Sequence, residues 1–232
     1  MLAHPRSTKP SDVSSQQEAD ALKLYFGTWR VVFAAGMLLL ISMGYVGSFL
    51  LLNNKGFDGL DAVMTALTHT GDAGVAGALL VLVGWRRKPL WVILGLVALI
   101  GSGLLAQVGK NLLFSDWQRP LALLSDGPSF RYTLSEPLRL QSFPSGHATS
   151  CAAVGWYLAL IFPRNITAIG LALAVWIVMI TRVYVGAHFL GDVLAGGALG
   201  TGTAALVYFA FRNRIHSSAS LAAYLSQSSI WL

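Results

Sequence analysis

The stretch 31-VVFAAGMLLLISMGYVGSFLLL-52 decides the fold class, because it contains no charged side chain. A helix that crosses a bilayer needs about 20 mostly apolar residues. Further apolar runs follow at Leu90–Gln107, Ala148–Phe162, Ile166–Ile180 and Val193–Phe211. A short run, Gly74–Trp85, reaches the required length only if Asp61–Thr70 continues it as a partly polar approach. The sequence therefore predicts an all-α, polytopic membrane protein with six transmembrane helices.

The composition supports this prediction. Of the 232 residues, 55% are hydrophobic and 11% are charged, whereas a soluble domain has about 25% charged residues. The net charge of +6 does not indicate nucleic-acid binding, because many of the Lys and Arg residues lie between apolar runs. The single cysteine, Cys151, excludes an internal disulfide and a zinc site built on thiolates. Cys151 lies within an apolar run, so we expect a buried, inert thiol.

The positive charges predict the orientation in the membrane. With six spans, one side of the membrane receives Arg30, Arg86, Arg87, Lys88, Arg164, Arg212 and Arg214. Positive charge is enriched in cytoplasmic loops, so we expect both termini in the cytoplasm. Residues 1–30 are then an N-terminal tail with an amphipathic approach helix near Leu22–Trp29. Residues 31–211 form the membrane domain, and residues 212–232 form a C-terminal tail. The outer side carries the long loop Phe114–Pro144, between the third and fourth helices.

Two cationic features lie at predicted outer helix ends. Lys110 lies just beyond the outer end of the third apolar run and is followed by Arg119-Pro120, and Arg182 lies just after the end of the fifth run. An ionisable residue at a membrane segment is a functional candidate by default. The alternative is that Lys110 and Arg182 are interfacial anchors. That alternative is weaker for Arg182, because anchoring positive charge is commoner on the cytoplasmic side.

The sequence Phe143-Pro144-Ser145-Gly146-His147 directly precedes the fourth apolar run. Ser145 can cap the helix, and Gly146 lets another group approach the backbone closely. Free N–H groups at a helix start form a ready anion site. The alternative is an ordinary helix cap with an interfacial histidine.

His188 and Asp192 are four residues apart, which puts them on one helical face. A carboxylate bonded to one imidazole nitrogen fixes the tautomer and leaves the other nitrogen free to act. A mutually satisfied buried pair is the alternative. Together the polar features supply three cations and two histidines, which suit a phosphate group and its transfer. They supply one clear carboxylate, Asp192, so we expect no metal site.

These residues resemble the three-part signature of the type 2 phosphatidic acid phosphatase family. That signature reads Lys…Arg-Pro, then Pro-Ser-Gly-His, then Ser-Arg, five residues, His, three residues and Asp. The matching elements here are Lys110…Arg119-Pro120, Pro144-Ser145-Gly146-His147 and Thr181-Arg182…His188…Asp192. Eight residues separate Lys110 from Arg119, where the family usually has six, and Thr181 replaces a serine. The longer interval predicts a displaced Lys110.

The resemblance implies a lipid phosphatase that needs neither metal nor cofactor. His188 attacks phosphorus and forms a phosphohistidine, and Asp192 orients His188. His147 protonates the leaving oxygen and then activates water. The phosphoryl oxygens are held by Lys110, Arg119, Arg182, the hydroxyl of Ser145 and the backbone N–H of Gly146.

The resemblance also implies the partners, which are the bilayer and a phosphorylated membrane lipid. The candidate lipids are undecaprenyl diphosphate, lipid A phosphate, phosphatidylglycerophosphate and phosphatidic acid. The expected location is the bacterial inner membrane, with the active site on the periplasmic face. We expect Arg131 and Arg139 to be solvated, although either could contact a second phosphate or a sugar. A phosphotransferase with the same intermediate remains an alternative, as does a transporter with an intramembrane charged site.

Overall fold

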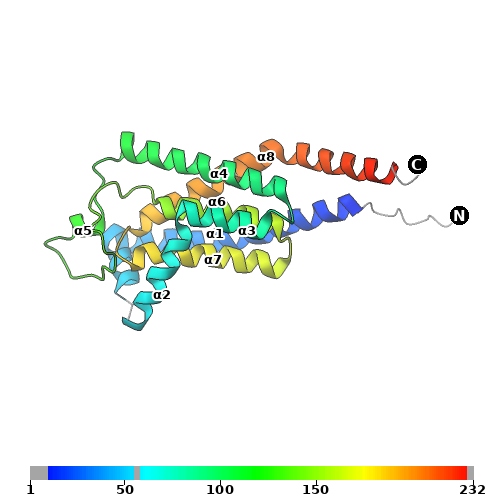
Figure 1. The fold of residues 1–232 in the computed structure, drawn as a ribbon. Coiled ribbons are helices and arrows are strands. Elements are labelled where there is room, and N and C mark those ends of the chain that lie inside the picture. The colour runs from blue at the N-terminus through cyan, green and yellow to red at the C-terminus, as the bar shows by residue number, and fades with distance from the viewer. Residues whose placement is uncertain (1–9, 55–57, 229–232) are drawn as a thin grey trace.

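The computed structural model describes residues 10–54 and 58–228, and all regular structure in these residues is helical (Figure 1). The all-α prediction is therefore confirmed. The outermost parts of the two predicted tails, residues 1–9 and 229–232, lie outside the described residues. The elements are α1 (Pro10–Asn53), α2 (Asp58–Thr68), η1 (His69–Gly71), α3 (Ala73–Gly84), α4 (Pro89–Val108), η2 (Gly109–Leu113), α5 (Pro120–Leu123), α6 (Gly146–Ile161), α7 (Asn165–Tyr184) and α8 (Leu190–Ser228).

Within the described residues, four helical segments are long and apolar enough to cross a membrane. They are Val13–Asn53, Pro89–Leu113, Asn165–Tyr184 and Leu190–Arg214. A fifth candidate is the pair formed by Gly59–Gly71 and Ala73–Gly84, which is bent by 74°. The polar approach predicted at Asp61–Thr70 is thus helical, but it does not continue α3 in a straight line. The chain turns at η1, where polar residues interrupt the apolar sequence.

α6 lies at the centre of the bundle. Of its 16 residues, 14 are buried, and it packs against α1, α3, α4, α7 and α8. A helix that is apolar on all sides is typically enclosed by other elements. At 1.5 Å per residue α6 is about 24 Å long, and it is shorter than the four segments that meet the length requirement. The predicted count of six therefore depends on including α6 and the bent pair.

The outer surface of the bundle is apolar. Leu38 is 67% exposed, Ile100 62%, Ile166 77% and Leu206 71%, and these residues come from four different helices. Exposed apolar surface of this extent is unusual on a soluble monomer. It is the surface expected of helices that face lipid.

The first and last spans belong to longer helices than predicted. α1 begins at Pro10 and continues to Asn53, with a non-helical backbone only at Gly44. The predicted approach helix near Leu22–Trp29 is part of α1, with one face buried through Ala21, Leu22, Tyr25 and Trp29. α8 continues to Ser228. The predicted tail boundaries at residues 30 and 212 thus fall inside continuous helices.

Two glycines let α8 pack directly on the backbone of α6. A Cβ at Gly196 would lie 2.3 Å from the Ser145 carbonyl oxygen, and a Cβ at Gly200 would lie 2.1 Å from that of Thr149. Small residues four apart allow close helix packing in membranes. This contact holds the start of α6 beside the first turns of α8.

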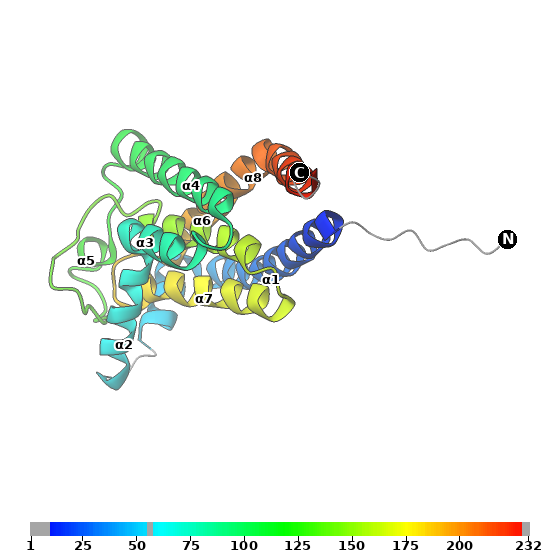
Figure 2. The ribbon, with the colours of Figure 1, turned by 45° about the vertical axis from the view of Figure 1, so that its right-hand side comes forward.

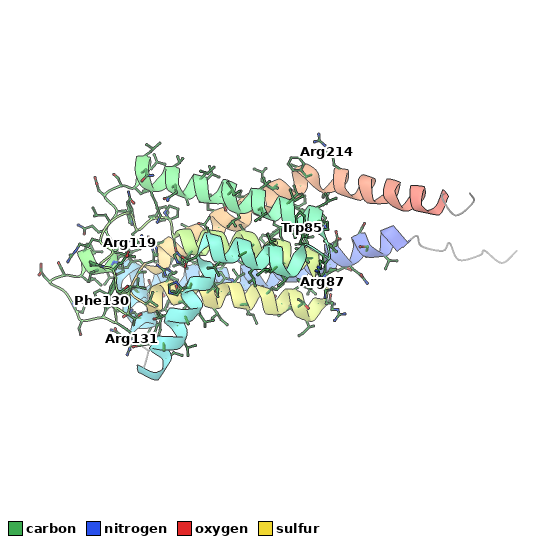
Figure 3. All side chains as sticks on the ribbon, in the orientation of Figure 1. Trp85, Arg87, Arg119, Phe130, Arg131 and Arg214 are labelled. Atoms are coloured by element: carbon green, nitrogen blue, oxygen red, sulfur yellow. The ribbon has the colours of Figure 1, made fainter. Side chains whose placement is uncertain are left out.

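The bundle has two chemically different ends. Figure 3 shows Arg87 and Arg214 at one end and Arg119 and Arg131 at the other. The N-terminal end of α1 and the C-terminal end of α8 lie at the Arg87 end in both ribbon views (Figures 1 and 2). The Arg87 guanidinium lies 4.9 Å from the ring centre of Phe162, which brings the α6–α7 connection to the same end. The long loop before α6 covers the opposite end.

Candidate active site

His188 lies in the turn between α7 and α8 and is 2% exposed. Its Nδ1 is 3.4 Å from Oδ2 of Asp192, and its Nε2 is 3.2 Å from Nη1 of Arg119. A guanidinium only donates hydrogen bonds, so Nε2 must accept and the ring proton must be on Nδ1. Burial, followed by the positive charge of Arg119, holds the pKa of His188 well below its usual range. His188 is therefore a neutral imidazole with its Nε2 lone pair directed at the cationic cluster.

The Asp192 carboxylate is held by donors from three parts of the chain. It accepts hydrogen bonds from the Ser142 hydroxyl at 2.5 Å, from the Phe189 N–H at 3.0 Å and from the Tyr45 hydroxyl. The Tyr45 hydroxyl in turn accepts from the Trp117 indole at 3.1 Å. Sequence reasoning missed Ser142 and Tyr45, because they reach Asp192 only through the fold. Asp192 is thereby fixed in the position from which it orients His188.

Arg119 is fixed by backbone carbonyls. Its Nε donates to Leu140 at 2.8 Å, its Nη1 to Ala187 at 3.1 Å and its Nη2 to Gln141 at 3.4 Å. The side chain is buried, and this burial is the first cause of a lowered Arg119 pKa. The guanidinium remains charged, because its ordinary pKa is far above neutrality.

Arg182, another member of the predicted cationic cluster, is in the last turn of α7 and is 4% exposed. Its Nη1 donates to the Thr68 hydroxyl at 2.8 Å. Its buried Nε has no hydrogen-bond partner among the described residues. An unsatisfied buried donor is costly, so this N–H is suited to an anionic ligand.

Lys110 reaches the cluster through a π-helical turn. In η2 the Phe114 N–H donates to the Gly109 carbonyl at 2.9 Å, five residues back. A π turn holds one residue more than an α turn. Lys110 is 9% exposed, and the charges of Arg119, Asp192 and Arg182 all act on it. The longer interval before Arg119 does not remove Lys110 from the predicted group.

The Pro-Ser-Gly-His sequence forms the start of α6. The Ser145 side chain accepts from the Ala148 N–H at 3.5 Å, so Ser145 is the predicted N-cap. The Ser145 N–H donates to the Asp192 carbonyl at 3.0 Å, which joins this sequence to the start of α8. Apart from its chain neighbours and the backbone of its own helix, no described atom lies within 4 Å of the Cβ position at Gly146. The backbone there is open to a ligand.

Asp72 is a second carboxylate of the site and was missed by sequence reasoning. It lies between η1 and α3, and its Oδ1 is 2.7 Å from Nε2 of His147. Its Oδ2 is 3.1 Å from Nδ1 of His69. The expectation of a single carboxylate was wrong, because the bend after α2 carries Asp72 to the start of α6. The signal in the sequence was a His and an Asp inside an otherwise apolar segment.

Arg131 is not solvated as expected. It forms an ion pair with Asp61, and Tyr184 donates to the same carboxylate at 2.7 Å. The Arg131 side chain is 22% exposed, because the loop before α6 folds onto α2. Arg139 is exposed, as expected.

An apolar cavity of about 360 Å³ lies among α2, α3, α6 and α7. Its lining includes Thr70, Ala76, Cys151, Val154 and Val178. A Cβ at Gly71 would lie 3.1 Å both from Cβ of His147 and from Val178. Val178 also lines the cavity, so one wall of the cavity lies near His147, across Gly71. The predicted burial of Cys151 is confirmed, since the side chain is 7% exposed.

Comparison with known proteins finds relatives that are named as lipid phosphatases. The chain is 52% identical over 60 residues to a lipid A 1-phosphatase of Rhizobium etli, covering 26% of this chain and 25% of that protein. It is 33% identical over 156 residues to a decaprenylphosphoryl-5-phosphoribose phosphatase of Mycobacterium tuberculosis, covering 64% of this chain and 79% of that protein. The match thus spans about a quarter of the length of the lipid A 1-phosphatase.

The fold is also that of a solved structure. The crystal structure of Aquifex aeolicus LpxE superposes with a TM-score of 0.63 at 23% identity, covering 70% of this chain and 93% of that one. Residues 89–216, which are more than half of the 232 residues and contain all three signature elements, match the PAP2 superfamily. The chain is an integral membrane protein and belongs to the PAP2 superfamily.

Proposed function

We propose that this protein is a membrane lipid phosphatase that hydrolyses a lipid phosphomonoester or diphosphate through a phosphohistidine. The observation that carries the proposal is the position of the His188 ring between two groups. Nδ1 faces Asp192 at 3.4 Å, and Nε2 faces the Arg119 guanidinium at 3.2 Å. The Nε2 lone pair is bonded here to the Arg119 guanidinium, and it becomes free to attack once a phosphoryl oxygen takes that N–H.

In the first step the Nε2 lone pair of His188 attacks phosphorus. The bond between phosphorus and the lipid oxygen breaks, and its electron pair stays on that oxygen, which takes a proton from His147. The imidazole ring gains positive charge as the N–P bond forms, and Asp192 stabilises that charge. Donors from Arg119, Arg182, Lys110, Ser145 and the Gly146 N–H hold the phosphoryl oxygens.

In the second step His147, now neutral, takes a proton from water. The water oxygen attacks phosphorus and the N–P bond breaks, which returns the lone pair to Nε2 of His188. Inorganic phosphate leaves. The cations take the role that a metal ion has in other phosphatases. The described residues contain no group of three or more His, Cys, Asp or Glu side chains that could hold a metal.

The apolar cavity favours a lipid substrate. It lies between α6 and α7, and Gly71 separates one of its lining residues, Val178, from His147. A hydrocarbon chain attached to a phosphate at the site would have an apolar environment nearby. The relatives of Rhizobium etli and Mycobacterium tuberculosis are named for lipid phosphates, which supports the same substrate class.

We infer that the chain crosses the bilayer six times, through α1, the bent α2–α3 pair, α4, α6, α7 and α8. Arg87 and Arg214 lie at the end opposite the site (Figure 3), and cytoplasmic ends carry the excess of positive charge. This supports an active site on the periplasmic face of a bacterial inner membrane.

The test is a phosphate-release assay on the protein purified in detergent. Four substrates are compared: phosphatidic acid, phosphatidylglycerophosphate, undecaprenyl diphosphate and lipid A, with products identified by mass. We expect release from at least one lipid in the presence of EDTA, and none from His188→Ala. Absence of release from all four lipids would contradict the proposed phosphatase. Loss of turnover in EDTA that magnesium or zinc restores would contradict the metal-independent mechanism.

A further inference from the structure

The contact between His147 and Asp72 has no counterpart in the proposed mechanism. It is 2.7 Å long and joins the first turn of α6 to the connection between η1 and α3. The site therefore contains two histidine–carboxylate pairs, His188 with Asp192 and His147 with Asp72.

Asp72 occupies the N-cap position of α3, but its side chain makes no capping hydrogen bond. An aspartate at this position usually accepts from a backbone N–H of the first turn. Both carboxylate oxygens instead face imidazoles, Oδ1 that of His147 and Oδ2 that of His69. The side chain is thus directed to the site and not to its own helix.

The charges around His147 are mostly positive. The ionisable groups that act on His147 are Arg182 on α7, Asp72, Lys110 in η2 and His69 in η1. The helix start adds a further positive potential. Among these groups Asp72 supplies the negative charge. An imidazolium, which His147 must be before it protonates a leaving oxygen, requires such a partner in this environment.

We propose that Asp72 is a positioning residue for His147, holding the ring by Nε2 and balancing the charge of its protonated form. The inference rests on the proposed phosphatase function. The Nε2–H stays bonded to the carboxylate throughout the cycle. Nδ1 gives its proton to the lipid oxygen as the P–O bond breaks, and it takes a proton from water in the second step. The same arrangement of carboxylate and imidazole orients His188 by its Nδ1, so the two rings act through different nitrogens.

The test uses Asp72→Asn, which keeps the shape of the side chain and removes its charge. The first-turnover release of the leaving group is measured for a lipid phosphomonoester and for p-nitrophenyl phosphate. We expect the rate on the lipid to fall about ten- to a hundredfold, because alkoxide departure needs a proton from the acid. Nitrophenolate leaves without a proton, so its release should stay within about threefold of wild type. Asp126→Asn, an exposed aspartate of the long loop, is the matched control.

A second readout needs only the lipid substrate. A general acid works while it is protonated, so the rate falls as the pH rises past the point where His147 loses its proton. Without the carboxylate the ring loses that proton more easily. The alkaline fall of the rate in Asp72→Asn should therefore begin about one pH unit lower, or more.

An unchanged alkaline limb, or equal losses on both substrates, would overturn the inference. A wild-type rate of Asp72→Asn on the lipid would also overturn it. So would a melting temperature of Asp72→Asn low enough for unfolding to explain the lost rate. Failure of the proposed function looks different, because wild-type protein would then release no phosphate or His188→Ala would retain activity.

Discussion

The hydroxyl of Tyr45, on α1, donates a hydrogen bond to the Asp192 carboxylate, on α8. The Tyr45 ring packs where α8 has no side chain, since a Cβ at Gly191 would lie 2.6 Å from Cε2 of Tyr45. The helix that precedes all signature motifs by many residues therefore helps to hold the carboxylate that faces His188, the proposed nucleophile. Tyr45→Phe removes the donor and keeps the ring.

We expect Tyr45→Phe to lower kcat about three- to tenfold with little change in KM, because one hydrogen bond to the carboxylate is lost. Steady-state kinetics on the lipid substrate measures this effect. Tyr208→Phe, near the opposite end of the α8 span, is the control and should leave kcat unchanged. Equal rates for wild type and Tyr45→Phe would show that Ser142 and Phe189 hold Asp192 without help.

The two histidines should respond differently to the leaving group. His188→Ala should be inactive on every substrate, because no N–P bond can form. His147→Ala should lose most activity on a lipid monoester and retain more on p-nitrophenyl phosphate, whose leaving group needs no proton. Rapid quenching with labelled p-nitrophenyl phosphate should give acid-labile label on His147→Ala and none on His188→Ala. Label that accumulates on His188→Ala would require the two roles to be exchanged.

The cations should each contribute strongly to turnover. Arg119→Ala and Arg182→Ala should lose about a hundredfold in kcat, since each removes a charge-assisted contact to the developing phosphoryl charge. We expect at least a tenfold loss for Lys110→Ala, because burial keeps this side chain within the cluster. Exposed Arg139→Ala should be nearly normal. An inactive Lys110→Ala beside a normal Arg119→Ala would show that the predicted phosphate cradle is wrong.

The packing of α8 on α6 predicts a sharp contrast between two glycines of one helix. A Cβ at Gly200 would lie 2.1 Å from the Thr149 carbonyl, whereas a Cβ at Gly202 would meet nothing within 4 Å. Gly200→Ala should destabilise the bundle by about 1–3 kcal/mol, and Gly202→Ala should not. Melting temperatures in detergent measure the difference. Equal melting temperatures would mean that α6 and α8 move apart to accept the added methyl group without loss of stability.

The orientation in the membrane can be tested with single cysteines in a Cys151→Ala background. Ser129 and Arg87 are both exposed, and Figure 3 shows Arg87 at the end opposite Phe130. An impermeant thiol reagent should label Ser129→Cys in intact cells and leave Arg87→Cys unlabelled until the membrane is opened. The reverse result would put the active site in the cytoplasm.

Much of the fold could be predicted, because long apolar runs identify helices from local sequence alone. The start of α6 was predicted to within two residues, and Ser145 was identified as its cap. The prediction was incomplete where a distant contact decides the structure. Nothing near Ser142 or Tyr45 indicates that both reach Asp192, and the bend that brings Asp72 to His147 results from a polar break in the second run. Ion pairing with Asp61 decides the position of Arg131, and that pairing also depends on the fold.

The π-helical turn at Gly109–Leu113 has a consequence for how related chains are found. A π turn holds one residue more than an α turn, so η2 can take up one of the two residues by which the interval between Lys110 and Arg119 exceeds the usual six. The interval between Lys110 and Arg119 can then vary in length while both side chains still enter one charged cluster. A pattern search that fixes this interval will reject chains like this one, whereas a search that lets it vary will retain them.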